Sequence, residues 1–221
     1  MNEKINRLLK NNRAWVEEMT RNDPAYFKRL AKGQTPDYLF IGCSDSRVPA
    51  NALTGTDPGE MFVHRNIANQ FLPHDLNCVA VVQYAVEVLD VQEVLVVGHY
   101  GCGGVQAAAS ANYHGVVDHW LGDLRSLART YAPLLQPLDA RAAHRKLVEL
   151  SVLQQVVHLS VDPTIRRAWD KGRRPRLTGL VYDLEQGLLE PLVTGVDSGE
   201  AAATVLPLVP LVAQSVGTLP G

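Results

Sequence analysis

The hydrophobic and polar positions along the chain alternate between short apolar runs and longer segments with helical spacing. The short runs, which turn residues bound, are typical of buried strands and lie at 38–42, 61–64, 93–98 and 176–182. Helical spacing covers the segments between them, at 78–89, 103–111, 115–131, 139–159 and 162–171. Strands that alternate with helices predict an α/β fold, with a mostly parallel central β-sheet flanked by helices.

Residues 1–34 precede the first predicted strand and predict a helical arm. Its apolar residues recur at helical spacing and form one stripe: Ile5, Leu8, Leu9, Trp15, Val16 and Met19. Asp23-Pro24 is typical of a helix N-terminus, so a second short helix is expected at 25–31, ending at Gly33. We expect the main domain or a second subunit to cover the apolar stripe.

The composition is that of a globular protein, with 221 residues of which 46% are hydrophobic and 20% charged. A net charge of -2 gives no basic field for binding nucleic acid. The three cysteines stand far apart and make a poor disulfide framework, which favours a reducing compartment. The amino-terminal segment is polar and lacks the apolar core of a secretory signal, so we expect a cytoplasmic protein. No linker divides residues 1–200, which predicts one domain.

Residues 201–221 carry no charged side chain and differ in this from the rest of the chain. Their length raises the question of a membrane span, which needs roughly 20 apolar residues. Only 12 of these 21 residues are hydrophobic, and Pro207 and Pro210 interrupt the segment. We therefore expect a variable tail that packs on the subunit or its partner, and no membrane anchor.

Residue types with metal chemistry follow two of the predicted strands. Cys43 lies just past the first of them, and His99 and Cys102 lie just past the third. Ligands bind at the carboxyl ends of parallel strands, where these side chains would meet. Two thiolates and an imidazole suit zinc, and three protein ligands leave a position for water, as in catalytic sites. The alternative is that the cysteines are buried apolar residues and His99 a core histidine.

Asp45 and Arg47 are two residues apart and lie on one side of an extended segment, where they can form a two-pronged ion pair. Asp45 is equally close to Cys43 along the chain, so its carboxylate is a candidate fourth metal ligand. The two partners compete for it. A simple surface salt bridge is the alternative, and it would contribute little to stability.

These segments together resemble the β-class carbonic anhydrases over roughly residues 1–195. The matching motifs are Cys43-x-Asp45-x-Arg47, the phrase from Phe62 to Asn69, Gln83-Tyr84-Ala85-Val86, and Gly98-His99-x-x-Cys102-Gly103-Gly104. The resemblance implies reversible hydration of carbon dioxide to bicarbonate and a proton, with one Zn²⁺ per subunit. By similarity, Cys43, His99 and Cys102 hold the zinc. Asp45 orients the zinc-bound hydroxide, and Arg47 holds Asp45 off the metal.

The resemblance also implies a substrate site and an assembly. Phe62, Ile67 and Tyr84 match the family's apolar cleft for carbon dioxide, and the Gly103 backbone borders it. Gln34 matches a glutamine that reaches into the neighbouring subunit's cleft. Family members are dimers or tetramers built from dimers, with the N-terminal helices wrapped on the partner.

One group of the family is switchable: its aspartate binds zinc at low pH, and bicarbonate in a nearby pocket stabilises that inactive form. That pocket contains a tryptophan, an arginine and a tyrosine. Arg65 and Tyr182 match the last two, while Phe40 replaces the tryptophan and lacks its indole N–H donor.

Two alternative functions stay open. One is a hydrolase of carbonyl sulfide or carbon disulfide on the same scaffold, and the other is a zinc-bearing scaffold or sensor without catalysis.

Overall fold

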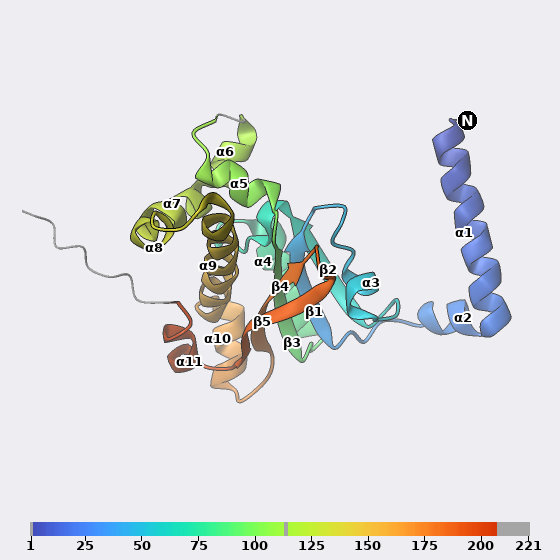
Figure 1. Ribbon diagram of the computed structural model, residues 1–221. Coiled ribbons are helices and arrows are strands. Elements are labelled where there is room, and N and C mark those ends of the chain that lie inside the picture. Colours follow the sequence, from blue (N-terminus) through green and yellow to red (C-terminus); the bar gives the residue numbers. More distant parts are fainter. Residues whose placement is uncertain (1, 113–114, 207–221) are drawn as a thin grey trace, which may run out of the picture.

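The computed structural model describes residues 2–112 and 115–206, which build one five-stranded sheet (Figure 1). The strands are β1 (Tyr38–Cys43), β2 (Met61–Asn66), β3 (Glu93–His99), β4 (Arg176–Asp183) and β5 (Leu188–Val196). Their order in the sheet is β2-β1-β3-β4-β5, with the first four parallel and β5 antiparallel to β4. All four predicted strands are confirmed, and the sheet is mostly parallel as expected.

The fifth strand was not predicted, although the sequence carries a signal for it. Two apolar runs separated by a short segment that contains Gly187 are typical of a hairpin. Pro191 within the second run argues against a strand, because proline has no N–H for the ladder. β5 is an edge strand, where proline is tolerated, and its register with β4 is irregular between Leu177 and Leu180.

The helices follow the predicted pattern, with breaks in two of them. They are α1 (Glu3–Asn22), α2 (Tyr26–Leu30), α3 (Ala50–Thr54), α4 (Leu76–Gln83), α5 (Gly103–Ala109), α6 (Val116–Trp120), α7 (Gly122–Thr130), α8 (Ala132–Leu135), α9 (Ala140–Ser160), α10 (Pro163–Asp170) and α11 (Gly199–Ala203). The helix expected at 115–131 is divided into α6 and α7 at Leu121. The helix expected at 78–89 is α4 followed by a π-helical turn, η2 (Tyr84–Val88).

The two faces of the sheet are covered unequally. The larger apolar core lies on the face against which α9 packs, with α4, α5, α7 and α10 around it (Figure 1). On the opposite face Phe40, Leu95 and Val97 form a smaller cluster with Met61 and with residues of the α3 segment. Successive residues of a strand point to opposite faces, so β1 contributes Leu39 and Ile41 to the first core and Phe40 to the second.

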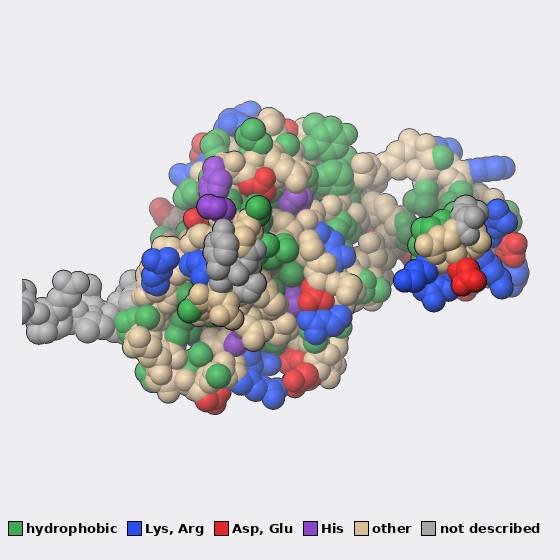
Figure 2. Space-filling view, turned by 90° about the horizontal axis from the view of Figure 1, so that it is seen from above, with side chains coloured by type: hydrophobic (Ala, Val, Ile, Leu, Met, Phe, Trp, Pro, Cys, Tyr) green, Lys and Arg blue, Asp and Glu red, His purple; other side chains and the backbone are tan. Residues whose placement is uncertain are grey.

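The N-terminal arm, α1 and α2, stands apart from the body of the molecule (Figures 1 and 2). Asn2 caps α1. The second helix is present as predicted but begins later than the Asp-Pro signal indicated: its N-cap is Ala25, without a side-chain cap bond, while Asp23 ends α1 and its carboxylate accepts from the Ala25 N–H at 3.0 Å. No residue of α1 is buried, and Leu8 is 58% exposed. The expected stripe is therefore present and is not covered by the main domain.

The charge-free segment begins within α11, which spans the expected boundary at residue 200 and packs on α9 through the buried Ala202. Residues 207–221 of the predicted tail lie outside the described residues. In the described part of the chain, no helix has the length and apolar character that crossing a membrane requires.

Candidate metal centre and catalytic cleft

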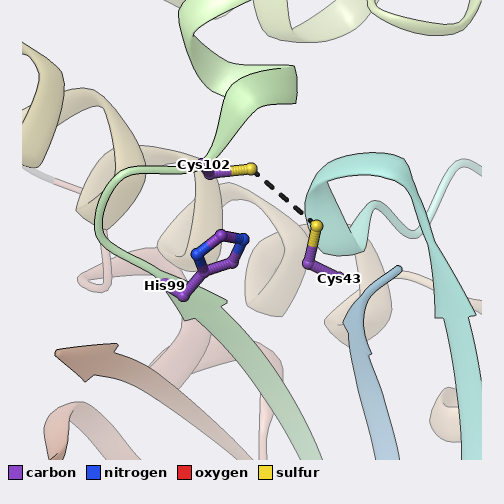
Figure 3. Close-up of side chains that lie close together, drawn as sticks. All are labelled: Cys43, His99 and Cys102. Carbon is purple, nitrogen blue, oxygen red and sulfur yellow. Dashed lines mark hydrogen bonds between the residues drawn. The ribbon is translucent and has the colours of Figure 1, made fainter. Parts of the chain in front are cut away.

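Cys43, His99 and Cys102 converge at the carboxyl edge of the sheet, as their positions after β1 and β3 predicted (Figure 3). One ligand atom from each lies within 4.8 Å of the others, and the two sulfurs are 3.9 Å apart. All three side chains are buried. We call this group the strand-end cluster. Neighbouring parallel strands bring Cys43 to β3, and the tight turn at Gly101, which has a φ of +70°, brings Cys102 back to His99.

The imidazole of His99 is oriented as a metal ligand would be. Its Nδ1 lies 3.1 Å from the Tyr100 carbonyl oxygen, so Nδ1 carries the hydrogen and donates it. Its Nε2 is buried and has no hydrogen-bond partner among the described residues. A lone pair left unsatisfied beside two thiols is costly unless a ligand occupies the space. The donor set and this orphan nitrogen both fit Zn²⁺.

Backbone N–H groups surround the two sulfurs. The hydrogen bond from the Cys102 thiol is the largest influence that lowers the pKa of Cys43. The adjacent His99 and the backbone N–H groups of Asp45 and Ala68 act in the same direction, against the effect of burial. The bond between the two thiols and burial raise the pKa of Cys102, while the N–H groups of Val105 and Gly104 oppose that rise. The site therefore stabilises a thiolate before any metal enters.

Asp45 and Arg47 form the expected two-pronged ion pair at the mouth of this cluster. Arg47 donates from Nε to Asp45 Oδ1 at 2.9 Å and from Nη2 to Oδ2 at 2.7 Å. The Arg47 backbone N–H adds a third bond at 3.0 Å, and together these hold the pKa of Asp45 well below its ordinary value. Asp45 Oδ2 also lies 3.8 Å from His99 Nε2. The carboxylate thus lies within reach of Arg47 and of the candidate metal position, the two partners that the sequence predicted to compete for it.

The residues expected to line the substrate cleft lie in different places on the chain. Ile67 follows the end of β2 and Gly103 follows Cys102, so both adjoin the cluster, whereas Phe62 lies near the start of β2, four residues before the Asn66 that pairs with Cys43. The rings of Phe62 and Tyr84 stack with centroids 5.8 Å apart and 29° between their planes. Ile67 is 42% exposed, and Gly103 is exposed at the start of α5, next to Cys102. Gln34 is exposed in the connection between α2 and β1 and makes no hydrogen bond with the described part of its own chain.

The residues predicted to form a regulatory bicarbonate pocket are spread over two environments. Phe40 is fully buried in the smaller core, with its ring over Gly42, and Tyr182 packs against the same core. Arg65 donates from Nε to the Cys43 carbonyl at 2.9 Å and from Nη2 to the Asp45 carbonyl at 2.6 Å. Its guanidinium therefore fixes the backbone of the segment that carries Cys43 and Asp45.

Sequence reasoning missed a short turn that supports the cluster, η1 (Ile67–Asn69). Ala68 adopts a left-handed conformation, with φ +61°, and directs its N–H to the Cys43 sulfur. The indole N–H of Trp120 donates to the Ile67 carbonyl at 2.8 Å, which holds the turn from the side of α6. A left-handed alanine has no strong signature in a single sequence, and the Trp120 contact spans more than fifty positions.

A second group of metal-binding residue types lies inside the larger core. The second cluster consists of His64, Asp75 and Cys78, whose ligand atoms also lie within 4.8 Å of one another. It joins β2 to the start of α4. Each of the two clusters thus combines a histidine with cysteine, and Cys78 is the cysteine that the zinc hypothesis does not use.

The sheet with a Cys-His-Cys group at its carboxyl edge defines an α/β protein with a candidate metal centre. A sequence model of the carbonic anhydrase family matches residues 38–189. The carbonic anhydrase of Emericella nidulans is 41% identical over 187 residues, which cover 84% of this chain and 82% of that protein. The carbonic anhydrase of Pseudomonas aeruginosa is 38% identical over 172 residues, which cover 75% of this chain and 77% of that protein. The chain belongs to the carbonic anhydrase family.

Solved structures refine this assignment to the β class. The β-carbonic anhydrase of Coccomyxa, solved in complex with acetazolamide, superposes with a TM-score of 0.87 at 37% identity, over 91% of this chain and 92% of that one. A tetrameric β-carbonic anhydrase of Sordaria macrospora superposes with a TM-score of 0.84 at 36% identity, over 88% of this chain and 100% of that one. This chain is thus a carbonic anhydrase of the β type.

Proposed function

We propose that this enzyme hydrates carbon dioxide reversibly to bicarbonate and a proton, with one Zn²⁺ per chain held by Cys43, His99 and Cys102. The observation that carries the proposal is the buried, unpartnered Nε2 of His99, which faces two thiols beside a fixed carboxylate. Bound there, zinc would supply a water acidic enough to be deprotonated near neutral pH.

Asp45 and Arg47 orient the reactants in this proposal. A carboxylate that three Arg47 bonds keep ionised accepts a hydrogen bond from the attacking oxygen and fixes its lone pair. Arg47 also holds Asp45 away from the strand-end cluster, which leaves a ligand position open. The bonds from Arg65 to the carbonyls of Cys43 and Asp45 keep that segment rigid.

The stacked rings of Phe62 and Tyr84, with the exposed Ile67, provide an apolar wall for an uncharged gas. We propose that Gln34 completes this cleft across a dimer, because it is free on its own chain. The uncovered stripe on α1, with the edge-to-face contacts of Trp15 on Tyr26 and Phe27, supports an arm that packs on the partner. The tetrameric relative is consistent with dimers that pair further.

We further propose that the enzyme is switchable by pH. Asp45 Oδ2 lies 3.8 Å from His99 Nε2, so a small rotation away from Arg47 would bring the carboxylate to the metal position. Bicarbonate bound near Arg65 would favour that movement by competing for the guanidinium that fixes the Asp45 carbonyl. Phe40 and Tyr182 would form the apolar side of that pocket.

Stopped-flow hydration of carbon dioxide between pH 6.5 and 9, with zinc stoichiometry measured on the same sample, tests the proposal. We expect one zinc per chain, with a rate that falls as the pH is lowered and disappears on chelation. A zinc-loaded protein with no hydration at pH 8.5 would contradict the activity. A flat profile over this range would contradict only the switch, and a fully active monomer would contradict the role of Gln34.

A further inference from the structure

A cavity of about 890 Å³ lies between α5, α7, α8 and the first part of α9, the helices that group together at the upper left of Figure 1. It has the size of a pocket for a cofactor-sized molecule. None of the cleft residues Phe62, Ile67 and Tyr84 lines it. It approaches the catalytic loop only at Gly101, which also accepts a hydrogen bond from Arg47 at 3.4 Å.

The charges around this cavity are of one sign. Arg125, Arg129 and Arg141 line it together with His144, and no carboxylate is found among its described lining residues. Arg125 pairs with Asp118 and Arg141 with Glu185, both of which lie outside the lining. The lining also contains Arg129, whose guanidinium makes no hydrogen bond or ion pair with the described part of the chain. One unpaired guanidinium is therefore available to a ligand.

Two buried nitrogens in the lining have no partner. Arg125 Nε and His144 Nε2 are both shielded from water and make no hydrogen bond within the described residues. Unsatisfied buried polar atoms are rare, and these two lie behind the cavity surface, so a bound acceptor would reach them only if the side chains shifted. The lining also includes several small apolar side chains, among them Ala128, Ala132 and Ala143, which leave room for an apolar body.

We propose that this cavity binds a small organic anion with a flat apolar body, whose carboxylate or phosphate pairs with Arg129 while the body lies on the alanine wall. Paired guanidinium and carboxylate groups form strong charge-assisted bonds, and the apolar part gains by leaving water. This site is separate from the metal centre, and the proposal does not depend on the enzyme's activity.

Titration calorimetry of the zinc-loaded enzyme with naphthalene-2-carboxylate tests the site. We expect one binding event per chain, weakened about tenfold or more in Arg129→Ala, which loses the charged partner. Ala140→Trp, which fills the cavity from an exposed position, should weaken binding to the same degree. Arg173→Ala removes an exposed arginine between α10 and β4 and should leave the affinity unchanged. The uncharged naphthalene-2-methanol should bind about tenfold more weakly than the carboxylate.

Hydration rates close to the parent value in all three variants would show that they fold. Inorganic phosphate as a second probe separates the two parts of the proposal, because it carries charge without an apolar body and should bind more weakly than the naphthalene carboxylate. If the parent, Arg129→Ala and Ala140→Trp bind naphthalene-2-carboxylate with equal affinity, the ligand binds outside this cavity and the proposal is overturned. The same conclusion follows if millimolar carboxylate does not bind.

Discussion

The strand-end cluster and the second cluster contain similar residue types, and both are buried, yet only the first is suited to hold a metal. Cys43 is 5% exposed and Cys78 is 0% exposed, so burial does not distinguish them. The groups next to each sulfur distinguish the two cysteines. The Cys102 thiol, with the backbone N–H groups of Asp45 and Ala68, lowers the pKa of Cys43, whereas burial and the carboxylates of Asp75 and Asp162 raise the pKa of Cys78 to about 12.

The carboxylates near Cys78 serve another purpose. Asp75 caps α4 through the Asn77 N–H, and Asp162 caps α10 through the N–H groups of Thr164 and Ile165. The imidazoles differ in the same way, because Asn66 Nδ2 lies 3.3 Å from His64 Nε2 while His99 Nε2 has no partner. Metal-binding residue types are therefore insufficient: a site needs free lone pairs and donors that stabilise thiolate.

The largest expected effect comes from removing one thiol from each cluster. Cys43→Ala should lose zinc and reduce carbon dioxide hydration by about three orders of magnitude or more, because a required ligand is gone. Cys78→Ala should retain one zinc per chain and near-parent rates, at a cost of about 1 kcal/mol in the free energy of unfolding for the small void. Elemental analysis and stopped-flow assays compare the two variants. Loss of zinc from Cys78→Ala would contradict the comparison.

The next effect concerns the carboxylate of each cluster. Asp45→Asn keeps the shape but cannot pair with Arg47 as an anion, so we expect zinc to stay and kcat/KM to fall about a hundredfold or more. Asp75→Asn is the matched control, because asparagine still caps a helix, and its rate should be unchanged. Stopped-flow rates with zinc content on the same samples measure both. Near-parent turnover in Asp45→Asn would show that this carboxylate does not orient the attacking oxygen.

The sequence predicted the strand-end cluster because the ends of strands can be located in it. Cys43 and His99 follow apolar runs that contain β-branched residues, and parallel pairing brings the ends of such strands together. It also predicted the Asp45–Arg47 pair, which is a local contact. It did not predict the Ala68 turn, the Trp120 bond or β5. The Ala68 turn and the Trp120 bond depend on contacts between distant segments, and β5 depends on an edge position that tolerates Pro191. Apolar periodicity carries no information on contacts between distant segments or on the position of a strand in the sheet.

A smaller effect tests the turn that supports the strand-end cluster. Trp120→Phe removes the N–H that holds the Ile67 carbonyl, so the Ala68 N–H should be less firmly directed at the Cys43 sulfur. We expect zinc to bind up to about tenfold more weakly, measured by competition with a chelator. Trp169→Phe removes a like bond, to the Pro175 carbonyl at 2.7 Å, far from the cluster. Equal zinc affinity in both variants would show that Trp120 serves stability alone.

The smallest effect concerns the histidine of the second cluster. Burial lowers the pKa of His64 from its ordinary value of 6.5, and Asp75 only partly opposes this. The unfolded chain therefore binds a proton more readily than the folded one, so stability is lost as the pH falls from 6.5 toward the folded pKa. His64→Gln, which can still accept from Asn66, should reduce the fall in Tm between pH 7.5 and 5.5 by about 2 °C.

Thermal melts with zinc content followed at both pH values measure this, since acid also protonates the thiols of the strand-end cluster. His119→Gln, at an exposed position, is the control and should keep the parent fall in Tm. If His64→Gln keeps it as well, then the acid sensitivity arises elsewhere and His64 is not held neutral by its surroundings. If the fall is reduced with zinc still bound, the second cluster is a neutral packing element, and the contrast with the strand-end cluster rests on titration as well as on geometry.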